Sequence, residues 1–256
     1  LHNHARMWFA SIWIFTLRLP WELGADFFLR HLLDGDPASN TLGWRWVAGL
    51  QTKGKTYLAR ASNIAKYTEE RFRPAPGELA DAAPALEGPD HPPRMAPPQG
   101  DAFDPAKPTA FILHEDDLSP GWLFDKGLQP LATATLTPSA RLSPLQMAPH
   151  VRDFRAAVTD EAASRWGERL GPVTRGLTEG AALADWARAV GAEQIVTAYA
   201  PVGAVRGVLD EIEGLPVHRI LRQYDAEAWP HAKAGFFKFR EKIPGLIGAM
   251  KGLRAA

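Results

Sequence analysis

Two stretches near the start of the sequence decide the fold of its first part: LHNHARM, residues 1–7, and DGDPASNTLGWRWVAG, residues 34–49. The first stretch leads into the longest apolar run of the chain, residues 7–17. Residues 2–18 therefore predict a helix that is buried on nearly all sides. The apolar run lies between two arginines and is too short to span a membrane.

The second stretch predicts a turn followed by a helix. Pro20 suits the first turn of a helix that ends near Gly35, since proline favours helix starts and glycine favours helix ends. Residues 34–37, Asp-Gly-Asp-Pro, are a turn signal, and Pro37 can open the next helix. We therefore expect three helices within the first 47 residues.

Polar side chains cluster on these helices. Asn3, Arg6 and Met7 have the spacing i, i+3 and i+4, so they share one helix face. An unpaired guanidinium in an apolar helix would be very costly, so Arg6 needs a carboxylate, and the candidates are Asp34 and Asp36. Asn40 and Trp44 also share a face. The pattern predicts a floor of amide, guanidinium and carboxylate groups backed by indoles.

The neutral composition of the whole chain conceals three different segments. Residues 1–73 have ten Lys and Arg against six Asp and Glu, residues 74–108 have two against six, and residues 109–256 are balanced. Ten of the 22 prolines lie in residues 74–108, which predicts an extended linker without a core. The absence of cysteine excludes a disulfide scaffold, an iron–sulfur cluster and a cysteine nucleophile.

Residues 109–256 alternate short apolar runs with amphipathic helical patterns. This alternation predicts a parallel, doubly wound sheet of Rossmann-like type whose ligand crevice lies beyond the carboxyl ends of the strands. Residues 115–117, Glu-Asp-Asp, follow the first strand at that end, and we expect an acidic, solvated loop there. The expected strands are 109–114, 131–136, 173–177, 194–199 and 217–222, and the expected helices are 147–169, 180–190, 203–213 and 235–252.

Residues 1–73 resemble the flavin-binding helical domain of the DNA photolyase and cryptochrome family. The motifs that carry the resemblance occur in the family's order: His2-Asn3, Arg6-Met7, Trp21, Asp34-Gly35-Asp36, Asn40 and Trp44-Arg45-Trp46. Residues 191–212 look like the later part of a photolyase α/β domain, which in the family usually comes first. The resemblance thus implies a multi-domain protein of rearranged order: part of an all-α FAD-binding domain in residues 1–73, a linker in 74–108 and an α/β domain in 109–256. The upstream half of the flavin domain, with the adenine and phosphate contacts, is expected to be missing.

The resemblance implies a role for each matching residue. Arg6 would pair with Asp34, Asn40 would face the reactive flavin nitrogen, and Trp44 and Trp21 would relay electrons to the flavin. Met7 and Trp46 would touch the flipped pyrimidine dimer. His4 stands where many photolyases have an arginine that contacts the DNA backbone, and Arg60 belongs to a basic strip suited to phosphates. Trp8 and Trp13 are expected to be core residues. The residues implied to line the isoalloxazine are Asn3, Arg6, Asp34, Asp36 and Asn40.

The resemblance implies a light-driven, FAD-dependent carbon–carbon lyase that repairs DNA. Met7 favours cyclobutane dimers, since enzymes that repair (6-4) products usually have a histidine there. Two alternatives stay open: a cryptochrome-like photoreceptor without repair activity, and a non-catalytic remnant that binds nucleic acid or a partner. We further expect damaged DNA as the partner, no metal, no membrane association, a monomer and a cytoplasmic location. The sequence leaves open whether an antenna pigment binds the α/β domain.

Overall fold

The computed structural model describes residues 1–250 and divides the chain into two compact units. Unit 1 consists of residues 1–92 and 140–154, and unit 2 consists of residues 93–139 together with the chain from residue 155 onward. This division differs from the predicted one, in which a linker separates residues 1–73 from residues 109–256. No helix within residues 1–250 combines the length and the apolar character needed to cross a membrane.

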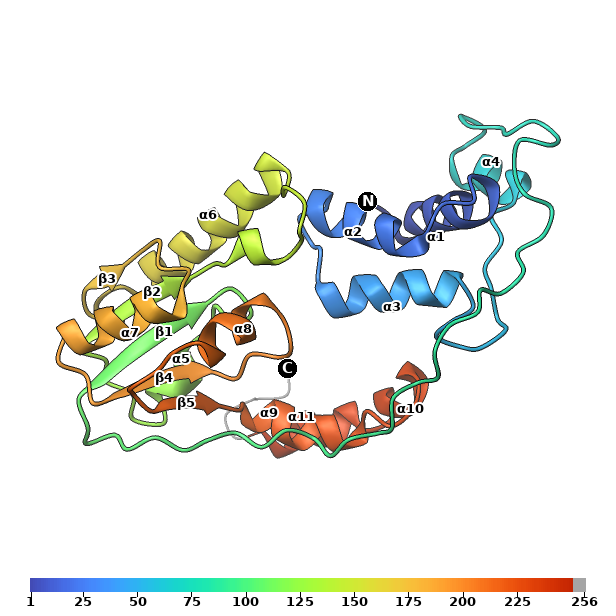
Figure 1. Ribbon diagram of the computed structural model, residues 1–256. Coiled ribbons are helices and arrows are strands. Elements are labelled where there is room, and N and C mark those ends of the chain that lie inside the picture. The colour runs from blue at the N-terminus through green and yellow to red at the C-terminus, as the bar shows by residue number, and fades with distance from the viewer. Residues whose placement is uncertain (251–256) are drawn as a thin grey trace. The chain divides into compact units, whose positions relative to one another are not determined.

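Unit 1 is built on helices (Figure 1), of which the first three begin within one residue of their predicted starts and the fourth was not predicted. The Asp36 carboxylate accepts a hydrogen bond from the Ser39 N–H at 2.6 Å, and Pro37 occupies the first turn, so this sequence starts a helix efficiently. Trp44, buried to 2% exposure, lies at the centre of the core of this unit. The helices are α1 (Asn3–Ser11), which continues as the π-helical turn η1 (Ile12–Thr16), α2 (Trp21–His31), α3 (Pro37–Val47) and α4 (Ala61–Tyr67).

The Pro-rich segment is not a free linker. Its first part packs on unit 1, where the Ala80 N–H donates to Thr16 Oγ1 at 3.1 Å and the Leu86 N–H donates to the Ala48 carbonyl at 3.0 Å. Its second part belongs to unit 2, where the Asp101 backbone and carboxylate both bond to the Arg219 backbone. Backbone groups and small side chains make these contacts, which explains why the segment shows no apolar periodicity.

Residues 140–154 add a second distant segment to unit 1. The Ser143 hydroxyl donates to the Asp26 carboxylate at 2.6 Å, and the Ala148 N–H donates to the Arg30 carbonyl at 3.1 Å. Asp26 also pairs with Arg30 at 2.7 Å, one turn further along α2. These contacts secure the carboxyl-terminal half of α2 within unit 1.

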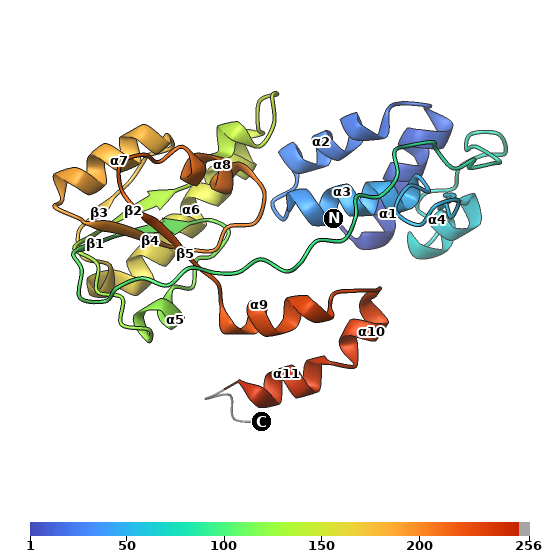
Figure 2. The ribbon, with the colours of Figure 1, turned by 60° about the horizontal axis from the view of Figure 1, so that its bottom comes forward.

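Unit 2 contains the predicted parallel sheet, with strand order β3-β2-β1-β4-β5. Alternate residues of β1 point to opposite faces. Ala110 and Ile112 pack with α7 (Gly180–Ala189) and α8 (Ala204–Asp210). Phe111 and Leu113 pack with α5 (Gly121–Phe124) and α6 (Pro149–Trp166). Figure 2 shows α7 and α8 on one side of the strands and α5 on the other. The strands are β1 (Thr109–His114), β2 (Ala132–Leu136), β3 (Val173–Thr174), β4 (Gln194–Ala198) and β5 (Val217–Ile220).

The four helices predicted in residues 147–252 are present, the last of them in two parts, whereas α5 and α9 (Gln223–Ala228) were not predicted. The strand expected at 173–177 is only two residues long. The helix expected at 235–252 is divided into two short helices, and residues 251 and 252 of that prediction lie outside the described part of the chain. The helices are α5 (Gly121–Phe124), α6 (Pro149–Trp166), which begins in unit 1, α7 (Gly180–Ala189), α8 (Ala204–Asp210), α9 (Gln223–Ala228), α10 (Phe236–Arg240) and α11 (Ile243–Ala249). Single turns η2 (Ser139–Arg141), η3 (Gly167–Leu170) and η4 (Trp229–His231) complete the set.

Candidate functional site

A cavity of about 430 Å³ lies in unit 1 among α1, the end of α2 and α3. Its size is within the usual range of small-molecule sites. Polar groups and apolar surface both contribute to its wall, as in most cofactor sites. The lining residues that the resemblance singles out are Asn3, Arg6, Met7, Asp34, Asn40, Trp44 and Trp46.

Arg6 and Asp34 form an ion pair on this wall. One guanidinium nitrogen of Arg6 donates to both carboxylate oxygens, at 2.7 and 3.0 Å, and Arg6 Nε donates to the Leu1 carbonyl at 2.8 Å. The hydrogen bond from Arg6 is the main reason why the pKa of the Asp34 carboxyl lies below its ordinary value. The partner of Arg6 is thus Asp34, and the pair connects α1 to the turn before α3.

Asn40 offers an oxygen to the cavity because its amide nitrogen is already used. The Nδ2 atom donates to the Ala25 carbonyl of α2 at 2.7 Å. A backbone carbonyl can only accept, so this bond fixes the orientation of the amide and leaves Oδ1 as the acceptor available to a ligand. One turn along α3, Trp44 lines the same cavity, and its buried Nε1–H has no hydrogen-bond partner among the described residues.

Trp46 and Met7 add a partly exposed apolar part to the wall. Trp46 is 39% exposed and its ring is roughly parallel to that of Tyr57, with centroids 5.9 Å apart and planes inclined by 29°. Met7 lines the cavity from α1. An aromatic face and a flexible thioether that line the same cavity can receive a flat, apolar group that enters from solvent.

Four predicted site residues do not line this cavity. Asp36 is exposed and caps α3, and Trp21 lies partly buried with the Arg45 guanidinium 5.8 Å from its ring centroid. The His4 ring packs 4.4 Å from the ring of Tyr67 in α4. Arg60 is exposed immediately before α4. The structure therefore places these four in capping, packing or surface positions.

Trp13 is a residue whose position the sequence did not reveal. Its ring centroid lies 6.2 Å from that of Trp44, with the planes nearly perpendicular, and its Nε1–H donates to the Pro20 carbonyl at 2.8 Å. Phe28 and Phe9 are the other rings around Trp44, at 5.1 and 6.2 Å. Sequence reasoning assigned Trp13 to the core because it lies in a uniformly apolar run, where helical spacing does not single out one residue.

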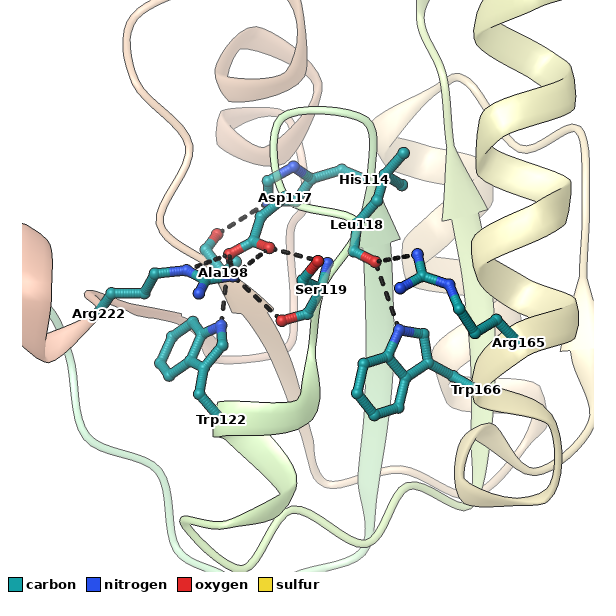
Figure 3. Close-up of polar contacts among 9 residues, drawn as sticks. All are labelled: His114, Asp117, Leu118, Ser119, Trp122, Arg165, Trp166, Ala198 and Arg222. Atoms are coloured by element: carbon teal, nitrogen blue, oxygen red, sulfur yellow. Dashed lines mark hydrogen bonds and ion pairs between the residues drawn. The ribbon is translucent and has the colours of Figure 1, made fainter. Parts of the chain in front are cut away.

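The acidic loop after β1 in unit 2 is not the solvated loop that we expected. Asp117 is only 13% exposed and makes a bidentate ion pair with Arg222, at 2.6 to 2.9 Å. Figure 3 shows this carboxylate between Arg222 and the indole of Trp122, which donates to it at 3.3 Å. The His114 imidazole, fully buried, bonds to the Ala198 carbonyl at 3.0 Å. These contacts connect the ends of β1, β4 and β5, while the buried Nδ1 atom of His114 has no hydrogen-bond partner among the described residues.

Glu115 in the same loop forms a second buried ion pair. Its carboxylate is 5% exposed and lies 2.7 Å from the Arg155 guanidinium of α6, which is 15% exposed. Burial raises the pKa of Glu115 although the nearby Arg155 opposes that shift. Two ionic groups with this little exposure connect α6 to the end of β1, and neither lines the cavity of unit 1.

The described residues contain no cluster of three or more His, Asp or Glu side chains that could hold a metal ion. The polar groups of the cavity instead suit an organic ligand. They include one guanidinium, one carboxylate, side-chain amides, a serine hydroxyl and an indole N–H that has no partner among the described residues.

Comparison with known proteins links unit 1 to one family. Residues 1–74 match the family model described as the FAD binding domain of DNA photolyase. A deoxyribodipyrimidine photo-lyase of Streptomyces griseus is 52% identical over 82 residues, which cover 27% of this chain and 18% of that protein. Those of Salmonella typhimurium and Agrobacterium fabrum are 40% and 47% identical over 58 and 49 residues, covering 23% and 19% of this chain and 12% and 10% of theirs.

The chain thus spans less than a fifth of the length of these curated relatives. No solved structure gives a significant match. The matched residues contain the turn before α3, the Arg6–Asp34 ion pair and the whole set of cavity residues described above. Residues 1–74 are thus similar to the FAD binding domain of DNA photolyase.

Proposed function

We propose that the chain works in light-driven, FAD-dependent repair of DNA and that its lesion is the cyclobutane pyrimidine dimer. The observation that carries the proposal is the cavity of unit 1, which brings together in one lining seven residues to which the resemblance assigns a role. These residues come from α1, the turn before α3, and α3 itself, so their convergence requires the tertiary fold.

The cavity suits the ring system of a flavin. An isoalloxazine combines a flat apolar portion with a polar edge of carbonyls and nitrogens, and the wall offers Phe28 and Val47 beside the Arg6 and Asn40 groups. The Trp44 Nε1–H is buried without a partner among the described residues at the same cavity, and a ligand acceptor would satisfy it. When bound, FAD supplies the absorption of light and the electron that reaches the lesion.

Each cavity residue then has a definite task. Arg6, held by Asp34, would place positive charge and hydrogen-bond donors at the polar edge of the flavin, which is how a protein tunes flavin electronics. Asn40 would present its oxygen to the reactive ring nitrogen. Trp44 would donate an electron toward the flavin, with Trp21 as the next donor.

The partly exposed part of the wall would receive the lesion. A photolyase takes its target out of the base stack, and extruded bases are held by stacking against aromatic and apolar side chains. Trp46 and Met7 provide such surfaces at the cavity. The repair step breaks the two carbon–carbon bonds that join the pyrimidines, and the electron then returns, so the reaction needs no net oxidant or reductant.

The experiment is blue-light repair by the complete chain. Protein purified with added FAD should show flavin absorbance, and illumination should restore thymines in an oligonucleotide that contains one thymine dimer. A protein that binds and photoreduces FAD but leaves the dimers unchanged would instead support the photoreceptor alternative. Failure to bind FAD at all would contradict both light-driven functions.

A further inference from the structure

A segment that follows the matched residues 1–74 is hydrogen-bonded to the loop after α3, next to the wall of the cavity. Residues 80–90, here named the strap, run along the loop that follows α3 without forming a helix or strand. The Leu86 N–H donates to the Ala48 carbonyl at 3.0 Å, and Thr56 Oγ1 donates to the Ala83 carbonyl at 2.8 Å. Both ends of the 48–56 loop are thereby tied to the strap.

The fit between strap and loop depends on small residues. Gly49 has a φ of +79°, and a Cβ there would lie 2.8 Å from the Ala85 Cβ. Gly88 approaches Leu50 in the same way, since a Cβ at Gly88 would lie 2.9 Å from Leu50 Cδ2. Lys53 and Asp90 form an exposed ion pair at the end of the strap. The close approach at several points marks the strap as a packed part of unit 1.

The fastened loop positions one part of the cavity wall. Tyr57, next to Thr56, donates its N–H to the Val47 carbonyl at 3.2 Å and stacks its ring on Trp46. Trp46 and Val47 both line the cavity, as does Gln51 within the loop. A chain of contacts therefore runs from Ala83 through Thr56 and Tyr57 to Trp46.

We infer that the strap is a positioning element for the Trp46 wall, with the Thr56–Ala83 hydrogen bond as its central fastening. This inference rests on the proposed function, because the wall that the strap positions is the one that would receive an extruded pyrimidine dimer. Thr56 and Tyr57 are positioning residues, because they reach the ligand only through Trp46. The family's cavity in this chain thus depends on residues that follow the matched region.

The test is hydrogen–deuterium exchange of the complete chain, read on peptides that cover residues 44–58. Thr56→Val removes the fastening at nearly constant volume, and exchange there should rise roughly two- to tenfold, the range expected for loss of one hydrogen bond. Thr56→Ser keeps the hydroxyl and should restore slow exchange. Thr52→Val is the matched control, since the exposed Thr52 side chain has no hydrogen bond among those described, and its exchange should equal that of the parent.

Affinity for an oligonucleotide with one thymine dimer gives the second readout. It should fall by a similar factor in Thr56→Val, recover in Thr56→Ser and stay constant in Thr52→Val, while exchange in unit 2 does not change. Unchanged exchange at residues 44–58 in Thr56→Val, or an equal rise in Thr52→Val, would overturn the proposed positioning role of the strap. If Thr56→Val unfolds, the milder Lys53→Met should still raise exchange locally, and no rise would likewise overturn it. Changed exchange without any oligonucleotide binding by the parent would reject the proposed function and leave the strap supported.

Discussion

Two aspartates of one motif have separate tasks at the residue scale. Asp34 holds Arg6 on the cavity wall, whereas Asp36 accepts the Ser39 N–H and starts α3. The sequence made both candidates for the partner of Arg6, because either lies in the turn before α3. Only the backbone path of the turn, with Gly35 buried between them, decides which carboxylate faces α1.

The first prediction uses this difference. Asp34→Asn should loosen the Arg6 guanidinium and weaken FAD binding severalfold, since an ion pair with a largely exposed carboxylate contributes up to about 1 kcal/mol. Asp36→Asn is the matched control, because asparagine caps helices as well as aspartate does and should leave FAD binding within about twofold. Flavin fluorescence titration measures both. Equal losses in the two variants would contradict a specific role for the Arg6–Asp34 pair.

The second prediction concerns the rings around Trp44. Trp13 lies close enough for direct electron exchange with Trp44, and its Nε1–H is bonded to a carbonyl that can stabilise an oxidised indole. Trp13→Phe should therefore slow photoreduction of bound flavin severalfold and lower the yield of the tryptophan radical in transient absorption. Trp8→Phe is the control, since Trp8 bonds to Asn63 away from the cavity. Full photoreduction in Trp13→Phe together with its loss in Trp21→Phe would assign the relay to Trp21 alone.

At the scale of elements, the close packing of α2 against α3 requires a residue without a side chain at Gly24. A Cβ at Gly24 would lie 2.2 Å from the Trp44 ring, so glycine allows α2 to approach the indole that lines the cavity. Trp44 is 2% exposed and surrounded by aromatic rings, which leaves it little freedom to move away. The close approach of the two helices is thus a condition for the cavity.

Gly24→Ala should destabilise unit 1 by about 1–3 kcal/mol, the usual cost of overpacking a core. Gly43→Ala offers a matched control in α3, where a Cβ would meet nothing within 4 Å. That substitution should stabilise the helix by roughly 0.5–1 kcal/mol, because glycine is the poorer helix former. Urea denaturation followed by tryptophan fluorescence measures whether each substitution lowers or raises the free energy of unfolding. Stabilisation by Gly24→Ala would show that the helices can move apart without cost.

The buried pair between α6 and β1 supports a prediction with a pH dependence. Because burial raises the pKa of Glu115, the folded protein keeps a proton that the unfolded chain releases. Stability should therefore fall as pH rises from the ordinary glutamate pKa, about 4.3, through the raised pKa of Glu115. Glu115→Leu with Arg155→Met should flatten this slope and leave stability at pH 7 unchanged or higher, as replacement of buried ion pairs often does.

Glu115→Leu alone should instead lose roughly 3 kcal/mol at pH 7, because it leaves the Arg155 guanidinium buried without its partner. Chemical denaturation of the parent, the single variant and the double variant between pH 4 and pH 8 measures all three curves. A single variant as stable as the double one would mean that Arg155 finds another partner.

The sequence predicted elements well where side chains carry the signal. The β1 boundaries, the start of α3 at Pro37 and the parallel arrangement of the strands follow from periodicity and helix-start signals. The position of Trp13 beside Trp44 and the choice of Asp34 over Asp36 depend on how helices cross, which periodicity does not contain. The acidic loop after β1 failed as a prediction because its partners, Arg155 and Arg222, are far away in sequence.

At the scale of the whole molecule, the predicted linker divides between the two units. Residues 80–90 and residues 93–99 are alike in that both contain proline and lack apolar periodicity. Only residues 80–90 are hydrogen-bonded to the rest of unit 1. The difference arises from backbone hydrogen bonds and alanine contacts, which side-chain hydrophobicity does not report. Composition therefore identified a segment without helices but could not locate the boundary at residue 92.

That boundary supports the last prediction. Residues 93–99 are almost entirely exposed, Met95 to 89%, and their backbone takes part in no hydrogen bond described in the structure. Proteases need an extended, accessible backbone, so trypsin should make its first cut between the units after Arg94. Arg71, exposed and followed by Phe72, lies before the strap and would release a shorter fragment, so mass spectrometry of the early products distinguishes the two sites. Arg94→Gln should slow the appearance of the first pair of fragments. Early cutting after Arg71 instead would mean that residues 72–92 leave unit 1 readily. A first cut after Arg94 requires the strap to stay bound while the residues beyond it are open.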